Sequence, residues 1–168
     1  GLRETKDVSA AINFAKSQKN LKSIGLYGFS MGAAIAIMTA SGNKEIKAVV
    51  ADSSYAEIGE MAKAMYRNMP LLDNLFSFLT QVFGVIWFRA MPAAISPVSY
   101  ISDINIPLLL IHGENDSQIP IAEVYKLKKA NEKAELWVIE GADHTEIYTK
   151  AKAEYENRVL EFFKANLE

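Results

Sequence analysis

A serine between two glycines is the first feature of this sequence that could do covalent chemistry. The residues Gly28-Phe29-Ser30-Met31-Gly32 have the G-x-S-x-G spacing and lie between a short apolar run and a segment of small apolar residues. In a strand–turn–helix setting this spacing presents the serine as a nucleophile. The turn is sharp, so we expect only very small side chains to fit at Gly28 and Gly32. The N–H of Met31 and the start of the helix would then face the reacting centre and stabilise an oxyanion.

A serine hydroxyl is a weak nucleophile and needs a base, usually a histidine that a carboxylate orients. The chain has two histidines. His144 lies in the segment 140–144, after the fourth apolar run, in a loop that we expect at the carboxyl edge of a sheet, where open α/β sheets place their sites. His112 closes the third apolar run, where a histidine is more often a structural residue that holds the next loop. We therefore predict His144 as the base.

Four carboxylates compete for the role of orienting acid. Asp116 follows the third apolar run and is expected at the same edge of the sheet. Asp52 ends the second run and could serve from a neighbouring position. Glu114 is too close to the strand end to reach the base easily, and Asp143 adjoins the base and points elsewhere. We favour Asp116 and keep Asp52 as the alternative, although an aspartate in either loop could instead cap a helix or turn the chain.

The elements that must position these residues follow an alternating pattern. Apolar runs alternate with helix-period segments, which is typical of β-α units and a parallel sheet. The predicted strands are 23–27, 46–51, 106–111 and 134–139, and the predicted helices are 4–18, 33–40, 121–130 and 146–165. The sequence therefore predicts an α/β fold with a parallel sheet of about four strands flanked by helices.

A long insertion, 53–100, separates the second predicted strand from the third. It is rich in methionine and aromatic residues: Met61, Met65, Met69, Met91, Phe76, Phe78, Phe83, Trp87 and Phe88. The stretch 75–94 approaches the ~20 apolar residues of a membrane span. Gly84, Arg89 and Pro92 interrupt it, so we predict a helical cap with an adaptable apolar wall over a pocket rather than a membrane span, and we do not expect membrane contact to be its main role.

Composition narrows the possible functions further. The chain has 168 residues, no cysteine and a net charge of −2. Its length suits a single domain, 1–168. The charge gives no basic surface, so we expect no nucleic-acid partner. Without cysteine there are no disulfides, thiol nucleophiles or thiolate metal sites, and serine chemistry needs neither a metal nor an organic cofactor. No signal peptide is visible, and we expect a cytoplasmic protein; an upstream targeting or anchor segment stays open, because the chain begins at Gly1 and not at Met.

The chain order Ser30, Asp116, His144 is the order of the triad in α/β-hydrolases. At this point the sequence resembles the α/β-hydrolase superfamily, and within it the dienelactone-hydrolase-like and serine-aminopeptidase-like serine hydrolases. The segments that carry the likeness are 28–32, 111–116 with 119–120, and 141–144. The resemblance implies that Ser30 is the nucleophile, Asp116 the acid and His144 the general base. It also implies that Met31 supplies one oxyanion-hole amide.

One departure from the family pattern matters for activity. A complete member has about eight strands, the nucleophile follows the fifth, and a loop after the third supplies a second oxyanion amide. Here the serine comes at position 30, so the chain looks like the C-terminal half of a hydrolase. Because losing one oxyanion donor costs ~10²–10³ in turnover, we expect weak or absent esterase activity. An unpaired first strand is a template for association, so we expect a homodimer or a bound N-terminal fragment at that edge.

Three functions remain in view. The first is a serine hydrolase that cleaves an ester, thioester or amide carbonyl of a small acyl substrate through an acyl-enzyme. The second is a non-catalytic interaction or assembly module derived from a hydrolase half, which the missing strands favour and the intact Ser30, Asp116 and His144 oppose. The third is association of the stretch 75–94 with a membrane surface and lipid-like substrates.

Overall fold

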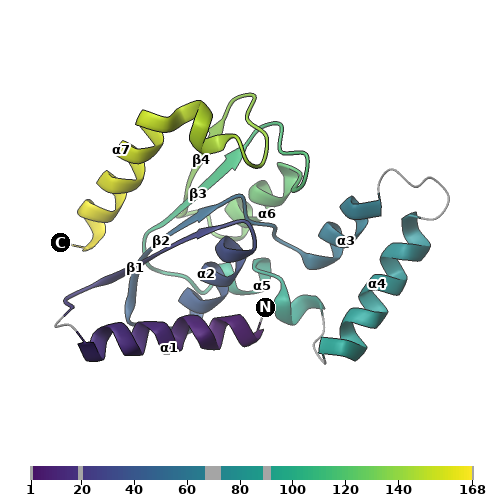
Figure 1. The fold of residues 1–168 in the computed structure, drawn as a ribbon, viewed down its shortest axis with the longest axis horizontal. Coiled ribbons are helices and arrows are strands. Elements are labelled where there is room, and N and C mark those ends of the chain that lie inside the picture. The colour runs from purple at the N-terminus through teal and green to yellow at the C-terminus, as the bar shows by residue number, and fades with distance from the viewer. Residues whose placement is uncertain (1, 19–20, 67–72, 89–91, 168) are drawn as a thin grey trace.

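The computed structural model of this chain describes residues 2–18, 21–66, 73–88 and 92–167. Strands and helices alternate along most of the chain (Figure 1). The elements are α1 (Leu2–Gln18), β1 (Ile24–Phe29), α2 (Met31–Gly42), β2 (Ile46–Asp52), α3 (Ile58–Tyr66), α4 (Asp73–Phe88), η1 (Pro92–Ile95), α5 (Val98–Ile101), β3 (Leu108–Gly113), α6 (Ala122–Ala130), β4 (Glu135–Ile139) and α7 (Ile147–Leu167).

The four strands form one parallel sheet in the order β1-β2-β3-β4. Every residue of β3 is buried, and in β2 only Lys47 is exposed. Such continuous apolar runs are characteristic of parallel strands that are covered on both faces. The predicted α/β fold with about four parallel strands is therefore confirmed. Within the part of the chain that the structure describes, β1 is an outer strand, and the association expected at its edge stays a prediction.

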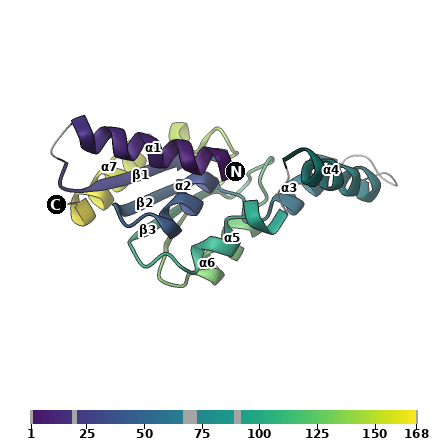
Figure 2. The same cartoon turned by 90° about the horizontal axis from the view of Figure 1, so that it is seen from below.

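Helices cover both faces of the sheet. Figures 1 and 2 show α7 on one face, and α1 and α2 on the other. Successive residues of a strand point to opposite faces, and β2 shows this clearly. Val49 packs in the cluster that includes residues of α1, α2 and α6, whereas Val50 packs with Tyr155 and Phe162 of α7. The sheet is thus covered on both faces, and its carboxyl edge carries the loops that hold the candidate site residues.

The strand ends differ from the sequence prediction where the site is built. Strand β1 continues through Phe29, two residues beyond the predicted 23–27, because its register pairs Phe29 with Asp52. Helix α2 begins at Met31 and not at Ala33, so Ser30 alone makes the turn. Strand β3 begins after Pro107, which has no N–H to donate to the ladder, and it runs on through Gly113.

The described residues between β2 and β3 are mainly helical. Ile58 and Met61 of α3 pack against a small cluster formed by Ala34, Tyr55 and Ile119. Helix α4 packs on α3, and both views show the two helices together at one end of the molecule, away from the sheet (Figures 1 and 2). Met69 and Met91 of the predicted apolar wall lie outside the described residues, and the cap at 53–100 stays a prediction.

Helix α4 exposes several large apolar residues. These exposed residues are Leu75, Phe78, Leu79, Val82, Phe83 and Ile86. Ser77, by contrast, is buried, and Gln81 donates a hydrogen bond to its carbonyl. None of the helices in the described ranges combines the length and the apolar character that crossing a bilayer requires.

Candidate active site

Ser30 lies alone between β1 and α2 in a strained backbone conformation. Its φ of 54° and ψ of −119° place it in a region that residues other than glycine rarely adopt. Such a conformation costs of order 1–3 kcal/mol and persists only where neighbours fix it. Here the N–H of Ser30 donates to the Asp52 carbonyl at 2.8 Å, and the Ser30 carbonyl accepts from Ala33 at 3.0 Å. The turn therefore holds the side chain above the carboxyl edge of the sheet.

The two glycines of the motif have different roles. A Cβ at Gly28 would lie 2.3 Å from the carbonyl oxygen of Gly32, so the turn excludes any side chain there. A Cβ at Gly32 meets no described atom within 4 Å. The expectation that close packing also requires a glycine at position 32 is therefore wrong for this structure, because it is the backbone of Gly32, and not a side chain at that position, that approaches Gly28.

His144 connects the serine to an aspartate. Its Nε2 lies 3.0 Å from the Oγ of Ser30, and its Nδ1 lies 2.7 Å from the Oδ2 of Asp116. A carboxylate only accepts hydrogen bonds and a neutral imidazole carries one N–H, so Nδ1 donates to Asp116 and Nε2 is left to accept from Ser30. The ring of Phe29 packs beside the imidazole at a centroid distance of 5.1 Å. The structure thus brings the three predicted side chains together.

Backbone donors fix the carboxylate of Asp116. Its Oδ1 accepts from the N–H groups of Gln118 at 2.9 Å and Ile119 at 2.7 Å, which leaves Oδ2 directed at the imidazole. The Nε2–H of His112 donates to the carbonyl of Ile119 at 2.9 Å, so this buried histidine holds the same loop from the other side. The acid is therefore presented by a closed loop with little freedom to rotate.

The loops that carry Asp116 and His144 are hydrogen-bonded to each other. Asn115 donates to the carbonyl of Ala142 at 3.0 Å. A Cβ at Gly113 would lie 2.5 Å from the same carbonyl oxygen, so a glycine at the end of β3 is required for this approach. The short distance between the acid and the base is thus built into the backbone.

The competing carboxylates have other partners. Asp143 accepts from the N–H of Ser117 at 2.7 Å, and this bond is the main cause that lowers the pKa of the Asp143 carboxyl. Glu114 accepts from the N–H of Gly141 at 2.9 Å. Asp52 accepts from the hydroxyls of Ser53 and Tyr155, and burial raises its pKa to about 6. Of the four candidates, Asp116 is the one placed against the imidazole.

Three neighbours of the site were not identified as such from the sequence. The sequence predicts that His112 holds a loop but does not show that Ile119 is its partner. Burial lowers the pKa of His112, and its Nδ1 has no partner among the described residues. The sequence identifies Phe29 as part of the G-x-S-x-G motif but not as a neighbour of the imidazole. Tyr155 lies on α7, and no local signal in the sequence indicates that its hydroxyl reaches Asp52.

The N–H of Met31, the predicted oxyanion donor, lies at the start of a helix. Met31 is the first residue of α2, and the first N–H groups of a helix have no acceptor within the helix. The positive end of the helix dipole also favours negative charge at this point. The Met31 side chain is 59% exposed, and the oxyanion role of its N–H stays a prediction.

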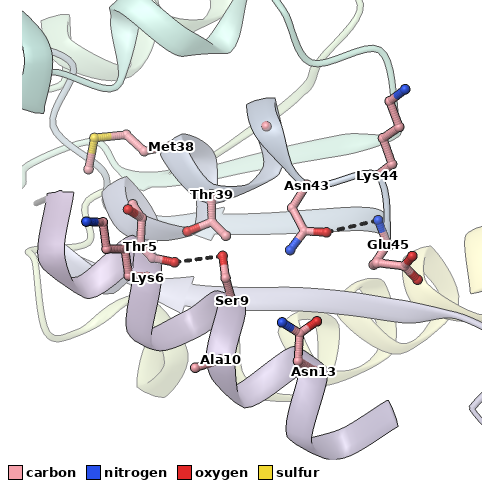
Figure 3. A pocket seen from close by; sticks show the side chains of 11 residues that line it. Thr5, Lys6, Ser9, Ala10, Asn13, Met38, Thr39, Asn43, Lys44 and Glu45 are labelled. Atoms are coloured by element: carbon pink, nitrogen blue, oxygen red, sulfur yellow. Dashed lines mark hydrogen bonds between the residues drawn. The ribbon is translucent and has the colours of Figure 1, made fainter. Parts of the chain in front are cut away.

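A small cavity of about 240 Å³ opens beside the imidazole. It is lined by Tyr27, Phe29, Asp52, His144, Thr145, Ile147 and Tyr148. A larger hollow of about 650 Å³ lies between α1 and the end of α2 (Figure 3), far from these residues in the fold. In that hollow the Ser9 hydroxyl donates to the Thr5 carbonyl of its own helix, and the Asn43 side chain accepts from the Glu45 N–H. The cavity beside His144 is the one that belongs to the site.

The described residues contain no cluster of three or more histidine, aspartate or glutamate side chains that could hold a metal ion.

Comparison with known proteins places this arrangement in a class. The chain superposes on the esterase Pf2001 of Pyrococcus furiosus with a TM-score of 0.79 and 31% identity, over 99% of this chain and 63% of that one. The acylaminoacyl peptidase of Pyrococcus horikoshii shares the fold, with a TM-score of 0.74 and 17% identity over 97% of this chain and 28% of that one. The four parallel strands and their helices are thus an α/β-hydrolase-like fold.

The sequence comparison is more specific. The dienelactone hydrolase family matches residues 2–167. The chain therefore belongs to the dienelactone hydrolase family. YqkD of Bacillus subtilis is 32% identical over 173 residues, which cover 96% of this chain and 55% of that protein. YfhR of Escherichia coli is 30% identical over 168 residues, with 96% and 53% coverage. The chain thus spans about half the length of the curated relatives it matches.

Proposed function

We propose that this chain carries the catalytic residues of a serine hydrolase that cleaves an ester, thioester or amide through an acyl-enzyme. The observation that carries the proposal is the continuous hydrogen-bonded path from Ser30 Oγ through His144 to Asp116, with distances of 3.0 and 2.7 Å. Packing alone does not require three such side chains to meet at the carboxyl edge of a sheet. Membership of a hydrolase family supports the same function.

In the first half of the reaction Ser30 is acylated. Its Oγ attacks the carbonyl carbon while Nε2 of His144 takes the hydroxyl proton. Asp116 accepts from Nδ1–H and so stabilises the positive charge that the imidazole gains. The carbonyl oxygen becomes an oxyanion that the N–H of Met31 can bind. The imidazolium then protonates the leaving alcohol, thiol or amine, and the C–O, C–S or C–N bond breaks.

In the second half a water molecule repeats the attack. His144 takes a proton from the water, whose oxygen attacks the acyl carbon, and the Ser30 ester bond breaks as Oγ regains its proton. Besides the substrate, the reaction consumes only water. The same three side chains therefore serve both halves.

The cavity beside His144 supports a small substrate group. Its volume of about 240 Å³ is below the ~300–1,000 Å³ of pockets that enclose drug-sized ligands. Phe29 and Ile147 supply an apolar wall, and the tyrosines add aromatic surface. We infer a short acyl or aryl group at this position.

A fluorophosphonate probe tests the assignment, because it phosphonylates a serine only where a base activates the hydroxyl. We expect the wild-type chain to be labelled and Ser30→Ala to remain unlabelled. Labelling is preferred to turnover, because it reports the activated hydroxyl directly and does not depend on the choice of substrate. Peptide mapping by mass spectrometry should find the adduct on Ser30.

Ser117→Ala is the matched control, since Ser117 is an exposed serine at the same edge of the sheet. It should be labelled at the wild-type rate. Equal labelling of wild type and Ser30→Ala would end the proposal. If the wild type were not labelled at any pH, the interaction-module alternative would replace it.

A further inference from the structure

The proposed mechanism does not use Asp52, a buried ionisable group beside the site. Asp52 ends β2 and is 2% exposed. Its Oδ1 accepts from the Ser53 hydroxyl at 2.9 Å, and its Oδ2 accepts from the Tyr155 hydroxyl at 2.6 Å. Neither donor carries a charge. A buried carboxylate without a cationic partner is costly to keep, and such groups concentrate at functional sites.

The groups that face Asp52 come from strand β1, helix α7 and the two adjacent loops. Tyr155 belongs to α7, and its hydroxyl donates its single proton to Asp52. The Tyr155 oxygen must therefore accept the hydroxyl proton of Tyr27, on β1, at 2.8 Å. Burial and the nearby Asp52 carboxylate raise the pKa of Tyr155, so it stays a hydroxyl donor. The charged or chargeable neighbours are His144 and Asp116, from the two adjacent loops. His144 is the one that can become a cation.

Two features connect Asp52 to the reacting groups. Its backbone carbonyl accepts the N–H of Ser30 at 2.8 Å. Asp52 and His144 also line the same cavity of about 240 Å³. Ser53, directly after it, has a φ of 56°, and Ser30 and Ser53 are the two non-glycine residues with positive φ in the described ranges. Backbone strain of this kind clusters where a site imposes its geometry.

We propose that Asp52 is a positioning residue whose negative charge, at the wall of the cavity beside His144, stabilises the imidazolium that forms when Ser30 gives up its proton. The inference rests on the proposed function. Asp116 fixes the tautomer and the orientation of the ring by direct contact. Asp52 adds a second negative charge from another side, without contact. The Tyr155–Tyr27 hydroxyl pair holds that charge in place and keeps it from needing a cation of its own.

Asp52→Asn tests the inference, because it removes the charge and keeps the shape. The readout is the titration midpoint of the His144 ring, followed by NMR in the purified chain, which requires no activity. We expect the midpoint to move down by about half a pH unit or more, since a unit charge in a partly buried site acts through a low effective dielectric. The acid limb of the Ser30 labelling rate should move in the same direction.

Glu114→Gln is the matched control. It also removes one negative charge from this edge of the sheet, but Glu114 is exposed. Solvent screens such a charge, so the His144 midpoint should move by less than a third as much. An equal shift in the two variants would overturn the inference, because the effect would then be one of net charge.

Tyr155→Phe keeps the experiment decisive if Asp52→Asn does not fold. It removes a donor that favours the ionised carboxylate, so the His144 midpoint should move in the same direction by a smaller amount. An unchanged midpoint in whichever of these two variants folds would overturn the inference. Absence of Ser30 labelling at all pH values would overturn the proposed function alone, since the NMR titration reports the coupling of Asp52 and His144 without it.

Discussion

Two aspartates end neighbouring strands at the same edge of the sheet, and their surroundings differ. Asp116, after β3, has two backbone N–H donors and an imidazole as partners. Asp52, at the end of β2, has two hydroxyls. Both side chains are buried. The first carboxylate is oriented for direct contact with the base, whereas burial raises the pKa of the second to about 6. The position of a carboxylate at the edge of the sheet therefore does not decide its role. The hydrogen-bond donors around the carboxylate do.

The largest effect should come from Asp116→Asn. An amide at this position can donate to Nδ1, which favours the wrong tautomer of His144, so Nε2 would no longer accept from Ser30. We expect the labelling rate of Ser30 to fall by about 10³–10⁴-fold. Glu114→Gln should stay within a few-fold of wild type. A loss below tenfold would show that Asp116 and Asp52 share the orienting role, and the contrast between them would fail.

A second effect should appear in stability against pH. The pKa of Asp52 is raised from 3.8 to about 6 on folding. Folding therefore favours the protonated form, so this contribution to the free energy of unfolding is fully present below pH ~4 and is lost as pH rises through ~6, by about 3 kcal/mol. Urea unfolding between pH 4 and 7.5 should show this loss in the wild type and not in Asp52→Asn.

Asp143→Asn gives the opposite sign and serves as the control for that experiment. The Ser117 N–H holds the pKa of Asp143 below its usual range, so its contribution is present near neutral pH and is lost on acidification. The variant should therefore be less stable than wild type near pH 7, with a difference that shrinks toward pH 3. If the free energy of unfolding varied with pH in the same way in wild type and in Asp52→Asn, folding would not raise the pKa of Asp52.

The smallest effect should come from Tyr27→Phe. The Tyr27 hydroxyl bonds to Tyr155 and reaches Asp52 only through it. Its loss should cost under about 1 kcal/mol of stability and should move the Asp52 titration less than Tyr155→Phe does. NMR of the Asp52 carboxyl carbon measures both. A larger effect from Tyr27 than from Tyr155 would mean that the hydroxyls do not act in series.

The fold and the three proposed catalytic residues were accessible from the sequence because their signals are local. The apolar runs before Asp52 and His112 predicted two strands of a parallel sheet, and the loops after the strands predicted where polar side chains would gather. The spacing around Ser30 predicted the turn and its glycine at position 28. The prediction for Gly32 failed, because which of two backbones approaches the other depends on the path of the helix and not on spacing.

What the sequence determined by itself was the parallel sheet, its carboxyl edge and the order of the residues that collect there, since strand and turn propensities act over a few neighbouring positions. The tertiary structure alone decided which carboxylate meets His144 and that Tyr155 serves Asp52. These pairings join residues far apart along the chain, and they form only when register, helix packing and loop contacts together fix the distances between side chains.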